Sequence, residues 1–438
     1  MQTIKIYYEL TAAAFDWAID KNKMVKAWGF NNQLPGPVIK AKKGDTLVIK
    51  VKNELDEPTM IHWHGIRLTA SMDGTGEAQK PIQPGATYEY NFVVPDAGTF
   101  WYHSHHNETE QMERGMYGAL IVEGDSDPVT DSDRVFMVDD MKLNRDSGHK
   151  KGNFVSRWVE RHDGRQGDTL LINGKENSII HMNAGQTERW RFINSSSARY
   201  FMLHLDGRTF KIIGTDGGLL EKSLDVKQTL LTPGERIDIL AGPFTEGETF
   251  SIESLPYNRT TILKAKRQQF ATVQVGPMKP SVTVIPEVLR KIEPLASADA
   301  EITRTIKLSV DPSLKHIIDF QINGGMHTND KTVNVGELQV WEVSNSSLMD
   351  HPFHLHGFFF QVLEENGKAP AYLSWKDTIN LTPRSKVKIA WMPDNRPGLW
   401  MYHCHILEHH EAGMMANFEV VDPNKGEQFA AQHHHCKE

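Results

Sequence analysis

Short runs in which apolar and polar residues alternate dominate the chain, and helical periodicity is scarce. Typical runs are "DTLVIKVKN", "TYEYNFVV" and "TERWRFIN", separated by glycine, proline and asparagine turns. Alternation with a period of two places apolar side chains on one face of a strand. The pattern therefore predicts an all-β protein built of antiparallel β-sandwiches.

An internal repeat divides these strands into three groups. The segments "GDTLVIKVKN" (44–53), "GQTERWRFIN" (185–194) and "GELQVWEVSN" (336–345) share one glycine-to-asparagine spacing. Their asparagines are followed after 12, 13 and 12 residues by the glycines of "HWHG", "HLDG" and "HPFHLHG". Three copies in register predict three consecutive sandwich domains.

Turn-rich and charged segments suggest where these domains end. We predict a first domain over 1–127, a second over 128–277, a linker over 278–302, a third over 303–424 and a tail over 425–438. The tail contains "QHHHCKE", which we expect to be a disordered end. A weak metal-binding role for His433–Cys436 is the alternative.

Composition excludes several classes of function. A net charge of -8 gives no electrostatic footprint for nucleic acid, and no apolar run approaches the roughly 18 residues of a membrane span. Two cysteines cannot make a disulfide framework. The start lacks the basic region of a signal peptide. We therefore expect a periplasmic or secreted protein in mature form, or else a cytoplasmic one, and the oligomeric state stays open.

Ten of the 21 histidines fall in four clusters. The clusters are His62 and His64; His103 and His105; His351, His354 and His356; and His403, His405 and His409. His-x-His on a strand places both rings on one face. Pairs from the first and third domains would thus converge eight imidazoles on one inter-domain cleft, although imidazole alone suits copper, zinc, iron and nickel.

The middle copy of the repeat has lost these histidines. His204 of "HLDG" matches His62 and His354, but Asp206 stands where the outer copies carry His64 and His356. The later segment "GETFSIESLPY" has no histidine at all. We therefore predict that the middle domain is a spacer without metal ligands.

A cysteine in "HCHILEHHEAGMM" (403–415) narrows the choice of metal. Two histidines, one cysteine and a weak axial methionine make a blue-copper site. Cys404, His409 and Met414 supply the local part, His351 is the fourth candidate, and Met415 is the rival to Met414.

Strand alternation also suggests what the thiolate is for. The sulfur of Cys404 would point away from His403 and His405, so an electron reaching the thiolate has a short covalent route to the histidine cluster. In the first domain, Ser104 stands at the position of Cys404 and Met116 echoes Met414. That domain looks like a copy whose thiolate centre has been lost.

Over essentially its whole length, the chain resembles a multicopper oxidase of the bacterial three-domain laccase type. The motifs "HWHG", "HSH", "HPFHLHG" and "HCHILEHHEAGM" carry the resemblance. It implies three cupredoxin-like Greek-key domains and about four coppers per chain: one type 1, one type 2 and two type 3. In the family, electrons from a reducing substrate enter at type 1 and pass to the trinuclear cluster, where dioxygen is reduced to water.

The resemblance also implies a role for each matching residue. His62 and His354 would bind the type 2 copper, and His351, Cys404, His409 and Met414 the type 1 copper. The type 3 pair would be bound by His64, His103, His105, His356, His403 and His405.

Proton delivery to the cluster would require an acid close to it. Asp73, eleven residues after His62, matches an aspartate that similar bacterial enzymes carry near the cluster; an ordinary Asp-Gly turn is the alternative. Many relatives carry an acid directly after the last type 1 histidine, where this chain has His410 and then Glu411. His106 and His410 are expected to be neighbours of ligands rather than ligands.

The leading hypothesis is a laccase that oxidises phenols and aromatic amines. The alternative is an oxidase of Cu(I) or another metal ion that serves copper tolerance; many such enzymes carry a methionine-rich insert, whereas these 17 methionines are scattered. A passive copper store is disfavoured, because wiring Cys404 between two cluster ligands has no use in storage.

Overall fold

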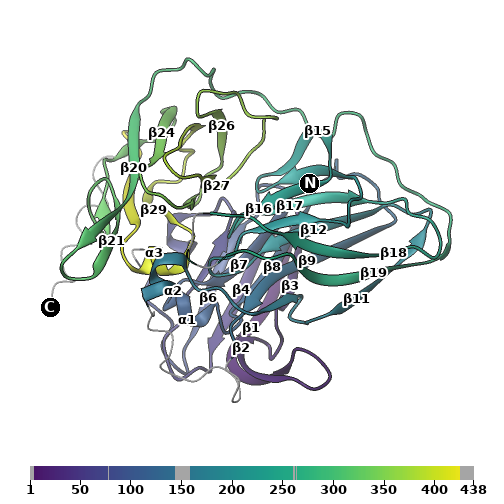
Figure 1. The fold of residues 1–438 in the computed structure, drawn as a ribbon. Helices are drawn as coiled ribbons and strands as arrows, with labels where there is room; N and C mark the ends of the chain where they lie inside the picture. The colour runs from purple at the N-terminus through teal and green to yellow at the C-terminus, as the bar shows by residue number, and fades with distance from the viewer. Residues whose placement is uncertain (1–3, 77, 144–157, 260–261, 263, 425–438) are drawn as a thin grey trace.

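The computed structural model describes residues 4–76, 78–143, 158–259, 262 and 264–424. The predicted tail with Cys436 lies outside these residues. The described chain forms six β-sheets, two for each copy of the sequence repeat. It is almost all β, with three cupredoxin-like sandwiches in succession, as the alternating pattern predicts (Figure 1).

The first sandwich packs sheet β2-β1-β4-β6 against sheet β3-β8-β7-β5. Strand β1 pairs antiparallel with β2 but parallel with β4, so the chain does not run as a simple meander. Its elements are β1 (Lys5–Ala18), β2 (Met24–Phe30), β3 (Gly36–Lys42), β4 (Thr46–Asn53), β5 (Ile61–His64), the 3-10 helix η1 (Ala70–Met72), β6 (Thr87–Val93), β7 (Gly98–Ser104), α1 (Glu108–Gln111) and β8 (Tyr117–Glu123).

The middle sandwich packs sheet β10-β9-β12-β17-β14-β15 against sheet β11-β19-β18-β13-β16. Its elements are β9 (Ser132–Met141), α2 (Trp158–Asp163), β10 (Thr169–Ile172), β11 (Ser178–Ala184), β12 (Glu188–Asn194), β13 (Phe201–His204), β14 (Phe210–Thr215), β15 (Gly218–Val226), β16 (Gln228–Leu231), β17 (Arg236–Ala241), β18 (Thr249–Leu255) and β19 (Gln268–Met278).

The third sandwich packs sheet β21-β20-β24-β28-β26 against sheet β22-β30-β29-β25-β27, with β23 also pairing to β30. Its elements are β20 (Arg304–Ser313), β21 (Ile317–Ile322), β22 (Thr328–Asn329), β23 (Val333–Asn334), β24 (Gln339–Asn345), β25 (His351–Leu355), β26 (Phe360–Glu365), β27 (Thr378–Leu381), β28 (Lys386–Trp391), β29 (Gly398–Cys404), α3 (Leu407–Glu411) and β30 (Met415–Val421).

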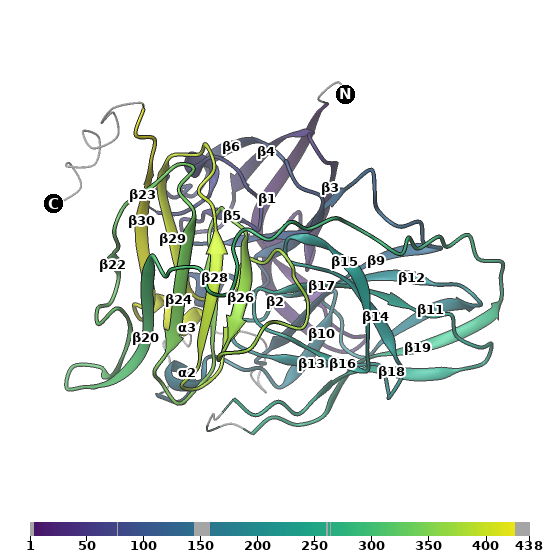
Figure 2. The same cartoon turned by 90° about the horizontal axis from the view of Figure 1, so that it is seen from above.

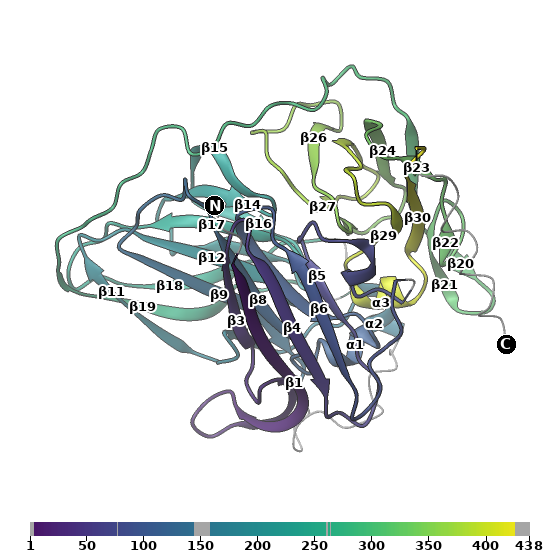
Figure 3. The same cartoon turned by 180° about the vertical axis from the view of Figure 1, so that it is seen from behind.

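The three sandwiches surround a common junction. Figures 2 and 3 show each as a separate block, with the middle and third sandwiches at opposite sides of the view and the first between them. One short helix from each block (α1, α2 and α3) lies at this junction (Figure 1). An apolar cluster there joins Trp101, Met137 and Leu407, one residue from each block. Among the described residues, no helix is long and apolar enough to cross a membrane.

The asparagine that ends each copy of the repeat forms equivalent hydrogen bonds to the backbone in all three sandwiches. Asn53, Asn194 and Asn345 are at most 1% exposed. Each Oδ1 accepts from the backbone N–H two residues later, at 3.0, 3.0 and 2.9 Å. Each Nδ2 donates to one backbone carbonyl four or five residues later and to another 29 to 37 residues later, at Ile82, Leu231 and Leu381. The side chain thus pairs backbone groups that water cannot reach.

Asn194→Ala should therefore destabilise the protein, because it removes the acceptor of the Ser196 N–H and a donor to each of the Arg199 and Leu231 carbonyls. We expect a loss of about 2 kcal/mol or more in the free energy of unfolding, seen as a lower midpoint in thermal denaturation. Asn91→Ala, at an exposed position of β6, is the matched control. Equal midpoints for the two variants would contradict this role.

Candidate metal centres

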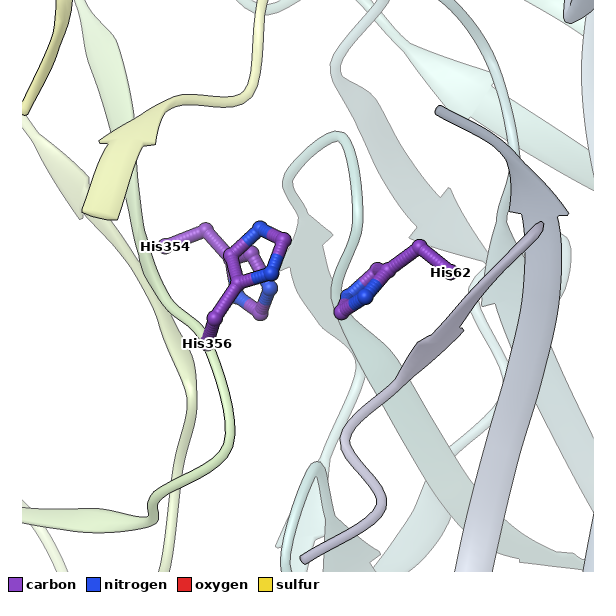
Figure 4. Close-up of side chains that lie close together, drawn as sticks. All are labelled: His62, His354 and His356. Atoms are coloured by element: carbon purple, nitrogen blue, oxygen red, sulfur yellow. The ribbon is translucent and has the colours of Figure 1, made fainter. Parts of the chain in front are cut away.

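Paired strands bring the eight cluster histidines together. In the first sandwich β5 lies antiparallel to β7, with His62 opposite His103. In the third, β25 lies antiparallel to β29, with His354 opposite His403. Figure 4 shows His62 facing His354 and His356 across the boundary between the two sandwiches. The predicted inter-domain cluster is thus present, and its histidines are at most 7% exposed.

The imidazole nitrogens converge in overlapping triads. One triad is His62, His354 and His356; others are His62, His64 and His103, and His105, His356 and His403. Within each, the ligand atoms lie within 4.8 Å of one another. The Nε2 atoms of His356 and His403 approach to 2.9 Å. Nitrogens that face each other so closely suit shared metal ions.

The ring nitrogens on the outer side of the cluster are fixed by hydrogen bonds. Nδ1–H of His62, His103, His354 and His403 donates to the backbone carbonyls of Asp73, Ser104, Asp377 and Cys404 at 2.9, 2.9, 3.0 and 2.8 Å. Fixing one nitrogen as N–H leaves the other with a free lone pair, as a metal ligand requires.

The inner nitrogens have no protein partner. Nε2 of His62, His103, His105 and His354, Nδ1 of His64 and both nitrogens of His405 are buried and make no hydrogen bond within the described residues. A buried polar atom without a partner costs about 1–3 kcal/mol. Bound cations would remove this cost, so the donor set fits metal ions.

Burial also keeps most of these rings in the form that binds metal. It lowers the pKa of His103, His356, His403 and His405 well below the usual value. These imidazoles are therefore neutral at physiological pH, and only neutral imidazole donates a lone pair to a metal.

A second centre lies around the thiol, inside the third sandwich. The Cys404 sulfur lies 3.5 Å from His351 Nδ1 and 3.6 Å from His409 Nδ1, and the two nitrogens are 3.2 Å apart. Burial raises the pKa of the Cys404 thiol to about 12. A thiolate forms here only if a bound cation stabilises it. One thiolate with two imidazoles is the donor set that suits copper.

The position of Met414 favours it over Met415 as the axial ligand. Met414 is fully buried and belongs to the same apolar cluster as Cys404, and its backbone carbonyl accepts from Cys404 N–H at 3.0 Å. Met415 begins β30, where it pairs with His403 and lies outside that cluster.

The middle sandwich covers the outer edge of this second centre. Nε2–H of His409 donates to the backbone carbonyl of His162, in α2, at 3.0 Å. The His162 ring stacks on Trp158, with centroids 5.5 Å apart, and Trp158 is 47% exposed. No local pattern predicts this contact, because His162 and His409 are 247 positions apart.

A closed polar network occupies the corresponding place in the first sandwich. Ser104 N–H donates to the Met116 carbonyl at 2.9 Å, as Cys404 N–H does to Met414. Thr59 precedes His62 by three residues, as His351 precedes His354. The hydroxyls of Thr59 and Ser104 both donate to Gln111 Oε1, at 2.8 and 2.5 Å. This place therefore holds hydrogen-bonded hydroxyl and amide groups, and the Gln111 amide N–H donates onward to the Glu57 carboxylate at 2.7 Å.

Asp73 touches the histidine cluster through both its side chain and its backbone. Its Oδ2 accepts from His356 Nδ1–H at 2.8 Å, and its carbonyl accepts from His62 Nδ1–H at 2.9 Å. Asp73 is fully buried. It thus lies where an acid could serve the cluster, and it is more than an exposed turn residue.

Sequence reasoning missed a second carboxylate, Glu108. Its Oε1 lies 2.9 Å from His105 Nδ1 and its Oε2 lies 2.9 Å from His410 Nδ1. The His410 ring in turn stacks on His403, with centroids 4.1 Å apart. Burial would raise the pKa of Glu108, but the two histidines hold it well below its usual range. A carboxylate of the first sandwich thus lies against His410 of the third.

Two acids of α3 complete the surroundings of the centres. Glu411 accepts from the backbone N–H and the hydroxyl of Thr109, at 3.0 and 2.7 Å, and so joins the third sandwich to the first. Glu408 precedes His409, and burial raises the pKa of its carboxyl to about 8.

Comparisons with known proteins agree with these centres. Three sequence profiles, each described as multicopper oxidase, match residues 11–127, 133–275 and 300–424. A multicopper oxidase of Staphylococcus aureus is 33% identical over 94% of this chain and 88% of its own length. The chain belongs to the multicopper oxidase family. Membership implies four copper ions of types 1, 2 and 3, with dioxygen and a reductant as substrates, and the two donor sets fit these ions.

Solved structures include relatives described as a metallo-oxidase and as a laccase, the two functions between which the sequence does not decide. A Campylobacter jejuni multicopper oxidase described as a metallo-oxidase has a TM-score of 0.83 and 29% identity, covering 95% of this chain and 91% of its own. A laccase from Pediococcus acidilactici has a TM-score of 0.82 and 30% identity, covering 95% and 90%. The comparisons therefore establish an oxidase and leave its reductant open.

Cys404→Ser should abolish both the blue absorption and substrate oxidation, because it removes the anionic sulfur and leaves the eight cluster histidines intact. Most of the remaining copper should be retained, as measured by elemental analysis. Ser104→Cys is the matched control: it adds a thiol where Thr59 and Gln111 replace imidazoles, so no second blue band should appear. Loss of all copper from Cys404→Ser would show that the centres assemble as one unit.

Proposed function

We propose that this multicopper oxidase is a laccase-type enzyme, which takes single electrons from phenols or aromatic amines and reduces dioxygen to water. His351, Cys404, His409 and Met414 hold the type 1 copper, and His62 and His354 the type 2 copper. The type 3 pair is held by His64, His103, His105, His356, His403 and His405. The converging triads support this assignment.

When bound, the coppers supply one-electron acceptance at type 1 and four-electron reduction of dioxygen at the cluster. The chain supplies the connection between them. Strand β29 carries Cys404 between two cluster histidines, which gives a covalent path through its backbone. The bond from His403 Nδ1–H to the Cys404 carbonyl, at 2.8 Å, is a second and shorter path from the sulfur's own residue.

The observation that supports an aromatic reductant is the aromatic cover of His409. The exposed face of Trp158 offers a flat apolar surface on which a phenol ring can stack. From there the His162 ring and its carbonyl lead to Nε2 of His409. Phe320 stacks on His409 from another side, at 4.0 Å between centroids. Such a surface can accept any aromatic reductant whose ring can stack on it and whose redox potential is low enough.

Two carboxylates support proton delivery to the cluster. Asp73 contacts His356, and Glu108 contacts His105, so each approaches one ring of the triad His105, His356 and His403. Reduction of dioxygen to water consumes four protons, and positioned acids speed such transfers.

Metal-ion oxidation is the second candidate, because the Campylobacter jejuni relative is described as a metallo-oxidase. Met349 and Asp350 directly precede His351 and offer a thioether and a carboxylate, but both are buried, at 3% and 1% exposure. Tyr257 and Asn380 already occupy the Asp350 carboxylate, at 2.6 and 2.7 Å. The aromatic reductant is therefore the better supported of the two.

Oxygen uptake with a phenol and with Cu(I), measured side by side, tests this function. We expect the higher kcat/KM with the phenol. Trp158→Ala should lower kcat/KM for the phenol by about 10-fold, as expected for the loss of about 1.4 kcal/mol of ring stacking. It should leave Cu(I) oxidation unchanged.

Trp158→Phe is the matched variant, because it keeps an aromatic ring and should recover most of the phenol activity. If Cu(I) is the better substrate and Trp158→Ala affects neither reaction, the enzyme is a metal-ion oxidase.

Asp73→Asn tests proton delivery. The amide oxygen can still accept from His356 Nδ1–H, but the group cannot ionise. Reduction of the type 1 copper by substrate should stay fast, and reoxidation by oxygen should slow, most at high pH where protons are scarce. Stopped-flow absorption at the blue band separates the two steps. Asp16→Asn, at an exposed position of β1, is the control, and equal reoxidation rates would leave Asp73 as a turn residue.

A further inference from the structure

The middle sandwich, which carries none of the proposed copper ligands, places one arginine behind the histidine cluster. Arg236, the first residue of β17, is 1% exposed. Its guanidinium binds the Asp377 carboxylate through both ends: Nη1 lies 2.7 Å from Oδ1, and Nη2 lies 2.5 Å from Oδ2. Two parallel hydrogen bonds of this kind fix the orientation of the carboxylate as well as its distance from the guanidinium.

The other donors of this guanidinium are also used. Nε–H donates to the Thr99 carbonyl at 3.1 Å, Nη1–H to the Gly234 carbonyl at 3.0 Å and Nη2–H to the Asp216 carbonyl at 3.0 Å. All five N–H groups of Arg236 are therefore paired. Thr99 belongs to the first sandwich and Asp377 to the third, so one side chain joins all three.

Asp377, the partner of Arg236, also forms hydrogen bonds with two proposed copper ligands. Its Oδ1 accepts from His64 Nε2–H at 3.2 Å, and its carbonyl accepts from His354 Nδ1–H at 3.0 Å. Because Nε2 of His64 is used in this way, Nδ1 is the nitrogen left free toward the cluster. His62, His103, His105 and His354 turn Nε2 inward instead. The Asp377 carboxylate thus determines which nitrogen of His64 faces the metal.

Two glycines show how closely the middle sandwich packs against the histidine cluster. Gly65, the last residue of "HWHG", has φ +86, and a Cβ there would lie 2.4 Å from Arg236 Nη2. A Cβ on Gly234 would lie 2.8 Å from the His405 ring. Neither position has room for a side chain, so the arginine and the turn before it are held directly against the cluster.

We propose that Arg236 is a positioning residue for the trinuclear site: through Asp377 it fixes the tautomer of His64 and the placement of His354. The middle sandwich is then required to assemble a metal cluster to which it contributes no ligand. This inference rests on the ligand assignment proposed above.

Arg236→Lys in the copper-loaded full-length protein tests the proposal. A lysine keeps the charge but cannot make the paired contact. We expect the blue type 1 absorption to persist and the type 2 EPR signal to change. Copper should be lost from the cluster about 10-fold more readily to a chelator, the usual cost when a group that orients a metal ligand is removed.

Arg191→Lys is the matched control. Arg191 is also 1% exposed, binds Thr99 Oγ1 at 3.0 Å and pairs with Asp133 and Asp238, and none of these partners is a histidine of the cluster. It should leave the type 2 signal and copper retention unchanged. Equal losses in both variants, or loss of the blue band with the rest, would mean that Arg236 only stabilises the interface and would overturn the proposal.

A double-variant cycle covers the case in which a single variant folds poorly. If Arg236 acts through Asp377, Arg236→Gln combined with Asp377→Asn should retain as much cluster copper as Asp377→Asn alone. Additive losses would overturn the proposal. A wild-type protein without any type 2 signal would instead contradict the proposed function, so the two failures are distinguishable.

Discussion

The constraint on which the structure depends is that eight buried imidazoles must face one another with their lone pairs free. No protein group satisfies the inner nitrogens within the described residues, and burial keeps most of the rings neutral. Such an arrangement is unfavourable for the polypeptide alone, because each unpaired nitrogen gives up hydrogen bonds to water. Metal ions that bind these nitrogens would therefore also stabilise the packing of the first sandwich against the third, which links domain packing to metal binding.

Local patterns in the sequence were enough to predict the sandwiches and the convergence of the histidines. A strand alternates with period two, so His-x-His in "HWHG" and "HCH" determines which face each ring occupies, and the repeat shows that both domains do this alike. The buried asparagines at 53, 194 and 345 explain why the repeat is visible in the sequence: each donates to a backbone carbonyl at an equivalent place, 29 to 37 residues later. The domain boundaries and the individual metal assignments stay predictions.

Contacts between domains were beyond the reach of sequence patterns. Glu108 meets His410 across 302 positions, and Arg236 meets Asp377 across 141. Neither pair follows a periodicity that a single sequence can display. Position 410 shows the limit well, because the carboxylate that contacts His410 belongs to another domain. The pattern that predicts a spacer in the middle domain concerns metal ligands alone, and it carries no information on a contact such as that of Arg236 with Asp377.

The Thr59–Ser104–Gln111 network has a consequence for the evolution of the first domain. If the outer domains descend from one duplicated ancestor, the first has exchanged a redox centre for neutral hydroxyl and amide groups that satisfy one another. Reversal would demand several replacements at once, because a lone thiol or imidazole would disrupt a satisfied buried network before it gained a metal. A single substitution therefore cannot restore a thiolate centre in the first domain. In the proposed mechanism, electrons from the reductant enter the protein only through the third domain.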